Sequence, residues 1–159
     1  RTTAARMRPA RLVGGILIAG MLATAGVAQA REAGAAGMVK TLTGTAQVER
    51  GGQVLPLAIG GAVFPGDRIV TPHNSTLGIV LNDDTAFTIG GNSRFSIDQF
   101  QFNPTTHQGK LGVALLRGTL RVITGLIARE SPADVAVVTP NSVIGVRGTD
   151  FIVEVPGND

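Results

Sequence analysis

The chain has 159 residues, enough for one domain with a hydrophobic core and hardly enough for two. It contains no Cys, which excludes disulfides, thiol catalysis and zinc-thiolate sites. The net charge of +3 comes from four arginines in the first eleven residues, since the remainder carries ten basic and eleven acidic residues. A near-neutral body without Tyr or Trp argues against nucleic-acid binding.

Residues 1–30 have the three parts of an export signal. Basic residues end at Arg11, an apolar stretch covers residues 12–28, and Ala28-Gln29-Ala30 is a small-x-small site for signal peptidase. We expect a helical signal peptide with translation from Met7, cleavage after Ala30, and a flexible lead-in over residues 31–37. The alternative is an uncleaved membrane anchor, but the apolar stretch is short and is diluted by glycines.

Residues 38–155 consist of short runs of Val, Ile, Leu, Thr and Phe, separated by Gly, Pro, Asn and Asp. This rhythm predicts an all-β domain, either a compact β-sandwich or a rolled antiparallel sheet of short strands. Alternation turns one face of residues 77–81, 87–89 and 95–97 inward. Glycines interrupt the near-helical leucine spacing within residues 111–127, so we predict strand there. Residues 156–159 are interpreted as a tail or the start of a continuation.

The body contains an internal pseudo-repeat. Residues 44–48 resemble residues 118–122, and residues 69–79 resemble residues 137–146 with one deletion. The second pair predicts that a unit of strand, Thr-Pro turn and strand is used twice. Between two alternating runs, Asp83-Asp84-Thr85 predicts a tight hairpin turn that needs a residue tolerating positive φ.

No catalytic set is recognisable. His73 and His107, the only histidines, lie in polar segments and are predicted to be surface residues, and no nucleophile elbow accompanies them. Asp83 and Asp84 are predicted to form a solvated acidic turn rather than a calcium site, so we assign no metal ligand. No phosphate-cradling loop is present. We therefore expect a protein that is not an enzyme, with no cofactor and no small-molecule substrate.

A set of motifs between residues 44 and 155 resembles the FecR domain in order and spacing. The residues that carry the likeness are Gly66, Asp67, Thr71, Gly118, Thr139, Pro140, Arg147, Gly148, Thr149 and Phe151. The resemblance implies a β-rich extracytoplasmic domain of a bacterium. Its best-known bearers are membrane regulators that relay a signal from an outer-membrane transporter to a sigma factor. Two departures are the few residues before the apolar stretch, too few for a sigma-binding helical segment, and Asp84, where the family usually has Gly.

Arg147 lies between two β-branched runs, with Asp150 and Glu154 as candidate partners. We interpret it as a structural clamp that pins the last strand to the sheet, rather than as an anion-binding group, because strand-embedded arginines near acids are usually satisfied internally.

The sequence as a whole predicts an exported FecR-like binding module, periplasmic or on the cell surface, which contacts an envelope protein partner and serves in envelope signalling. One alternative is a regulator of transmembrane signalling tethered by an uncleaved leader, the only route by which we expect membrane contact. Another is the N-terminal head of a longer surface adhesin or envelope protein. The loop at residues 103–109 and the strand edge after Val155 are the surfaces expected to meet a partner.

Overall fold

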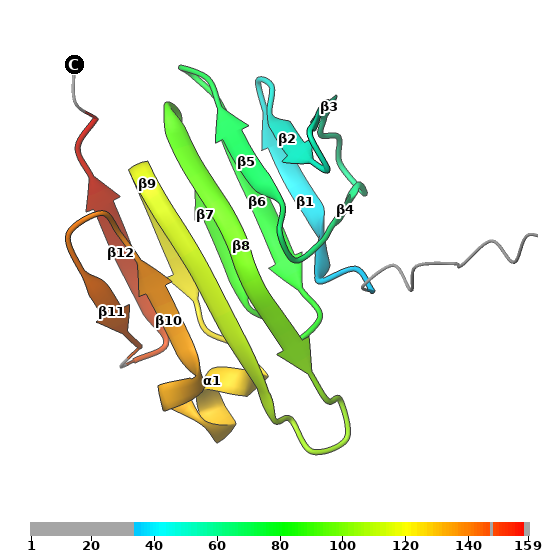
Figure 1. The fold of residues 1–159 in the computed structure, drawn as a ribbon, viewed down its shortest axis with the longest axis vertical. Helices are drawn as coiled ribbons and strands as arrows, with labels where there is room; N and C mark the ends of the chain where they lie inside the picture. Colours follow the sequence, from blue (N-terminus) through cyan, green and yellow to red (C-terminus); the bar gives the residue numbers. More distant parts are fainter. Residues whose placement is uncertain (1–33, 147, 158–159) are drawn as a thin grey trace, which may run out of the picture. The chain divides into compact units, whose positions relative to one another are not determined.

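The computed structural model describes residues 34–146 and 148–157 (Figure 1). These residues form twelve strands, one short α-helix and one 3₁₀ turn. The strands in chain order are β1 Gly37–Thr43, β2 Gln47–Arg50, β3 Gln53–Pro56, β4 Ala62–Val63, β5 Arg68–Thr71, β6 Thr76–Leu81, β7 Ala86–Ile89, β8 Ser93–Phe102, β9 Gly109–Ile123, β10 Val135–Val138, β11 Val143–Gly145 and β12 Asp150–Val155. The helix α1 spans Leu126–Glu130, and the 3₁₀ turn η1 spans Pro132–Asp134. The all-β prediction is confirmed.

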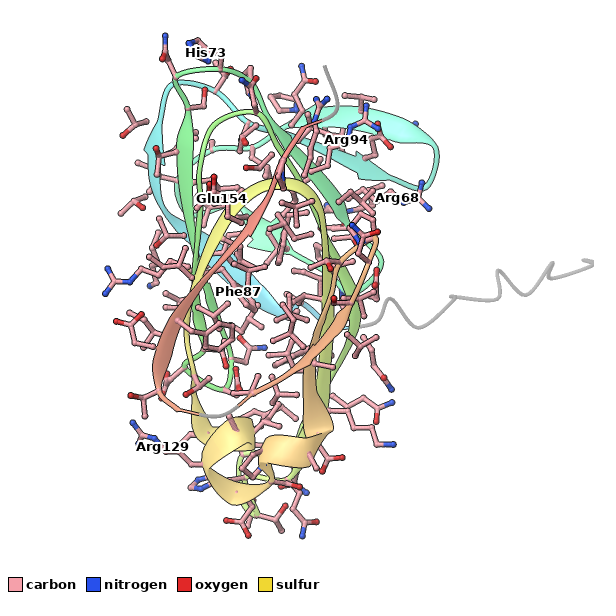
Figure 2. The ribbon with its side chains drawn as sticks, turned by 90° about the vertical axis from the view of Figure 1, so that its left-hand side faces the viewer. Arg68, His73, Phe87, Arg94, Arg129 and Glu154 are labelled. Atoms are coloured by element: carbon pink, nitrogen blue, oxygen red, sulfur yellow. The ribbon has the colours of Figure 1, made fainter. Side chains whose placement is uncertain are left out.

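The strands form one sheet that folds over into two layers. Layer A has the order β4-β1-β6-β7-β9-β12. Layer B has the order β3-β2-β5-β8-β9-β10-β11. Strand β9 belongs to both, because its first half pairs in layer B and its second half in layer A. The sheet is thus rolled and sandwich-like at once, and Figure 2 shows the two layers edge-on with Phe87 between them.

One pair of strands departs from the antiparallel prediction. β10 runs parallel to β9, with Val135 opposite Leu111, and the crossover between them contains α1 and η1. The helix includes Leu126 and Ile127, which fell inside the predicted strand 111–127. β9 itself ends at Ile123, so the strand prediction is right for most of that segment and wrong for its last residues. A parallel neighbour requires such a crossover connection.

The core lies between the layers and follows the predicted alternation. The inward residues of all three predicted runs are buried, namely Leu77, Ile79, Leu81, Phe87, Ile89, Phe95 and Ile97. The rings of Phe87 in layer A and Phe95 in layer B meet at a centroid distance of 5.2 Å, so aromatic contact joins the two layers. β1 begins at Gly37, one residue before the predicted start of the domain.

The two copies of the pseudo-repeat adopt the same order of elements but different pairings. In the first, β5 belongs to layer B and β6 to layer A, so the Thr-Pro turn carries the chain between layers. In the second, β10 and β11 pair with each other as a hairpin within layer B. Two similar strand-turn-strand sequences therefore occur in two different sheet arrangements. The layer to which each strand belongs depends on the strands it pairs with and not on the Thr-Pro turn.

Candidate interaction surface

The first family motif forms an ionic clamp. Gly66 adopts φ +91 in the turn before β5, and Asp67 is only 1% exposed. The Asp67 carboxylate accepts two hydrogen bonds from Arg50, from Nε at 2.8 Å and Nη2 at 2.7 Å, and one from the Phe64 N–H at 2.9 Å. The Arg50 guanidinium also lies 4.4 Å from the Phe64 ring centroid. Sequence reasoning missed Arg50, which is 17 residues from its partner and carries no local signal.

The second motif pair lies where the chain crosses between layers, a region we call the crossing corner and define by Thr71, Gly90, Ser93 and Gly118. The Thr71 hydroxyl donates to the Gly90 carbonyl at 2.6 Å and accepts from the Ser93 N–H at 3.1 Å. Gly118 adopts φ +99 in the middle of β9, and a Cβ there would overlap the Ser93 side chain. These residues hold the bend that lets β9 pass from one layer to the other.

The pseudo-repeat recurs at atomic detail in this region. The Thr119 N–H donates to the Ser93 hydroxyl at 3.2 Å, and the Thr45 N–H donates to the Ser75 hydroxyl at 3.1 Å. Each threonine follows a glycine with positive φ, Gly118 or Gly44. The likeness between residues 44–48 and 118–122 thus corresponds to one local structure, a positive-φ glycine followed by a threonine whose N–H donates to a buried serine hydroxyl.

The third group of motif residues surrounds the last turns. Thr139 and Pro140 begin the β10–β11 turn, in which the Thr139 N–H donates to the Ser142 carbonyl at 2.8 Å. The carbonyls of Gly148 and Thr149 accept hydrogen bonds from Thr124, at 3.3 Å from its hydroxyl and 2.9 Å from its N–H respectively. Phe151, in β12, packs against the core. The motif residues that the structure describes therefore lie in three separate places.

Arg147 lies outside the described residues, so its role as a clamp stays a prediction. One of its two expected partners is already engaged: Arg121 binds the Asp150 carboxylate through Nε at 3.0 Å and Nη2 at 2.6 Å. The hydrogen bond from Arg121, with its positive charge, lowers the pKa of Asp150. Both side chains remain exposed.

The acidic hairpin differs from its prediction at one residue. Asp84 is exposed and adopts φ +67, which confirms the need for positive φ in this turn. Asp83, expected to be solvated, is 0% exposed. Its carboxylate accepts from the Thr85 hydroxyl at 2.7 Å and from the Ile127 N–H at 3.4 Å, so it fastens the hairpin to α1. A buried carboxylate needs such donors, and α1, which supplies one of them, was not predicted.

The histidines lie where the sequence placed them. His73 is exposed at the turn after β5, and His107 is exposed in the β8–β9 loop, stacked on Phe102. Within residues 34–146 and 148–157, no group of three or more His, Cys, Asp or Glu side chains is arranged to hold a metal ion. The same residues include no helix with the length and apolarity to cross a membrane.

The most distinctive surface is the outer face of layer B. A row of facing residues crosses all seven strands, because the registers place Val54 opposite Glu49, then Arg68, Ser96, Ala114, Val138 and Val143 in turn. Its second half is aliphatic: Val138 is 38% exposed and Val143 71%, and the nearby Leu116 is 54% exposed. Contiguous exposed apolar side chains of this kind are typical of interaction sites. We call Leu116, Val138 and Val143 the apolar patch.

Arginines border the apolar patch. Arg68 on β5 and Arg94 on β8 are diagonal neighbours in the register, and Figure 2 shows Arg68 on the outer side of layer B. Both line a hollow of about 350 Å³ together with Leu116 and Ala114. Among the described residues, neither guanidinium has a hydrogen bond or an ion pair. Sequence reasoning missed this face, although the alternation of β5, β8 and β10 already turns these side chains outward.

Comparisons with known proteins give the chain a family. A search of curated proteins found no match. A solved structure described as a "Cell surface anchoring domain" is 31% identical over 38% of this chain and 82% of that chain, with a TM-score of 0.37. The family model for "FecR protein" matches residues 67–159, more than half of the chain. The match begins at Asp67 of the ionic clamp and includes the motif residues from Thr71 to Phe151, and so the chain belongs to the FecR family.

Proposed function

We propose that this protein is an exported interaction module of a bacterial envelope, periplasmic or at the cell surface, which binds an envelope protein and serves in signalling rather than catalysis. Family membership and the export signal read in residues 1–30 support the location. The observation that carries the binding role is the apolar patch on layer B.

Ile59 and Ile152, elsewhere on the described surface, are each 66% exposed, whereas the apolar patch joins three neighbouring strands of one layer. Buried side-chain polar atoms in the described residues all have hydrogen-bond partners. Ionic groups such as Asp67 are neutralised within the fold. Val143 is nevertheless 71% exposed, beside the half-exposed Val138. Burial of these side chains by a partner would remove apolar area from water at about 25 cal/mol per Å².

Site-specific photo-crosslinking in the envelope of the host bacterium tests the binding role. A photoreactive residue at Val143 should give a discrete crosslinked protein, whereas the same residue at Thr88, exposed on the outer face of layer A, should not. Equal crosslinking from both positions would contradict a specific surface on layer B.

The N-terminus of the mature protein separates the exported module from the tethered alternative. Mass spectrometry should find a chain that begins at Arg31. A chain that retains residues 12–28 would instead favour the membrane-tethered regulator.

A further inference from the structure

We propose that the outer face of layer B selects a partner segment in which acidic side chains stand next to aliphatic ones. This inference rests on the proposed function and adds the chemistry of the partner. It follows from the arginines that lie beside the apolar patch.

The arginines of this face are neighbours of one another in the register. Arg94 on β8 lies opposite Arg117 on β9 in the register, and Arg68 is the diagonal neighbour of Arg94 on the other side. Like charges directly opposite each other on neighbouring strands are destabilising. Among the described residues, none of these three arginines forms an ion pair. A carboxylate from another molecule would offset this repulsion and use the guanidinium donors.

The acids on the same face form no ion pair with the arginines among the described residues. Asp98 lines the hollow, where its carboxylate accepts a hydrogen bond from the Ser96 hydroxyl at 2.7 Å. Glu49 is opposite Arg68 in the register and yet forms no ion pair with it within the described residues. Glu49 lies on β2, on the far side of Arg68 from the apolar patch, and Asp98 lies on β8 two residues beyond Ser96. Arg117 follows Leu116 in β9 and lies opposite Arg94, so positive charge adjoins the apolar patch at Leu116.

The shape of the face favours a protein segment over a membrane. Arg68 and Arg94 line a hollow of about 350 Å³ rather than a convex surface. A flat anionic bilayer would leave this hollow unfilled. A segment of protein can place an aliphatic side chain over Leu116 and a carboxylate between Arg68 and Arg94. Electrostatic complementarity of this kind sets specificity more than raw affinity.

The test is selection from a random peptide library displayed on phage, with the full chain as immobilised target. The wild-type protein should enrich peptides with Asp or Glu beside Val, Leu or Ile. The double variant R68E/R94E should enrich Lys and Arg in place of the acids. The matched control R129E has the same type of charge reversal on α1, at the other end of the molecule from Arg94, and should select as the wild type does (Figure 2).

Further measurements make the result decisive. Peptides selected by the wild type should bind R68E/R94E about tenfold more weakly or worse. The neutral variant R68Q/R94Q should also lose acidic selection, and circular dichroism melts would show that each variant is folded. Identical selections by the wild type and R68E/R94E would overturn the inference, as would binding to phosphatidylglycerol vesicles that requires these arginines without any acidic selection.

A second variant pair separates failure of the inference from failure of the proposed function. If the double variant L116S/V143S no longer binds the selected peptides while R68E/R94E binds them as the wild type does, the inference of an acidic partner is wrong and the proposed binding surface is supported. If neither L116S/V143S nor R68E/R94E changes the selection, both proposals fall.

Discussion

The ionic clamp between Arg50 and Asp67 allows a quantitative prediction. Replacing Arg50 with Met removes two charge-assisted hydrogen bonds and leaves a carboxylate that is 1% exposed and accepts a hydrogen bond from the Phe64 N–H. Removing one partner of a buried pair costs about 3 to 5 kcal/mol. Because the Arg50 side chain is 36% exposed, water can partly replace it, and we expect the lower value, about 3 kcal/mol.

That loss corresponds to a fall in Tm of about 12 °C, at about 4 °C per kcal/mol for a domain of this size. The chain has no Trp or Tyr, so unfolding in urea and by heat is best followed by far-UV circular dichroism. Arg68→Met is the matched control, because this exposed arginine has no ion pair among the described residues and its loss should change the free energy of unfolding by less than about 0.5 kcal/mol.

The double variant R50M/D67L sharpens the test. Replacing both charges with apolar side chains should recover about half of the loss, because no charge is then left buried. Recovery should be incomplete, since Leu leaves the Phe64 N–H without its acceptor. If R50M unfolded at the same urea concentration as R68M, the clamp would contribute nothing to stability and the reasoning would be refuted.

Three other changes test separate features. Gly118→Ala should lower the free energy of unfolding in urea by more than about 3 kcal/mol, because the added Cβ would overlap Ser93. Gly148→Ala, at a similar φ but with open space around it, should lower it by only about 1 kcal/mol. Equal losses would show that crowding at the crossing corner contributes nothing. Asp84→Gly should raise the free energy of unfolding by about 0.5 kcal/mol, because φ is +67 there, and a loss would contradict this. NMR titration should find the pKa of Asp150 below its ordinary value and higher in Arg121→Gln. Because the pKa of Asp150 is lower in the folded state than in the unfolded state, the ion pair stabilises the fold at pH values above the ordinary pKa of Asp, and this stabilisation is lost as the pH falls through the folded pKa. An Asp150 pKa that is the same in the wild type and in Arg121→Gln would exclude the pair in solution.

Sequence patterns predicted those features that depend on neighbouring residues alone, namely which face of a strand is buried and where a turn needs positive φ. The alternation of residues 77–81 gave the correct buried face, because a strand must turn its apolar side chains to one side. Positive φ in the turn at residues 83–85 was predicted from the turn residues, and the family resemblance pointed to Asp84 as its position. By contrast, the assignment of β5 and β6 to different layers depends on partners far along the chain, and the similar Thr-Pro segment at β10 and β11 forms a hairpin.

The functional surface escaped prediction for the same reason. Arg68, Arg94 and Val143 are spread over 76 positions of sequence, and only the register brings them onto one face. The prediction for Asp83 was wrong because one of its donors, the Ile127 N–H, belongs to a five-residue helix too short to show periodicity. The ten motif residues identified the family, whereas the exposed side chains between them identify the candidate surface.

The shared strand β9 has a consequence for how the molecule opens. Because its two halves pair with β8 and β10 in one layer and with β7 and β12 in the other, neither layer has a complete set of neighbours without it. Amide hydrogen exchange should therefore be slow in both halves of β9. The free energy of opening derived from it should be the same in both halves and equal to that of global unfolding. A partner bound to layer B would then protect amides in layer A as well, which makes the whole domain respond as one cooperative unit to an event on one face.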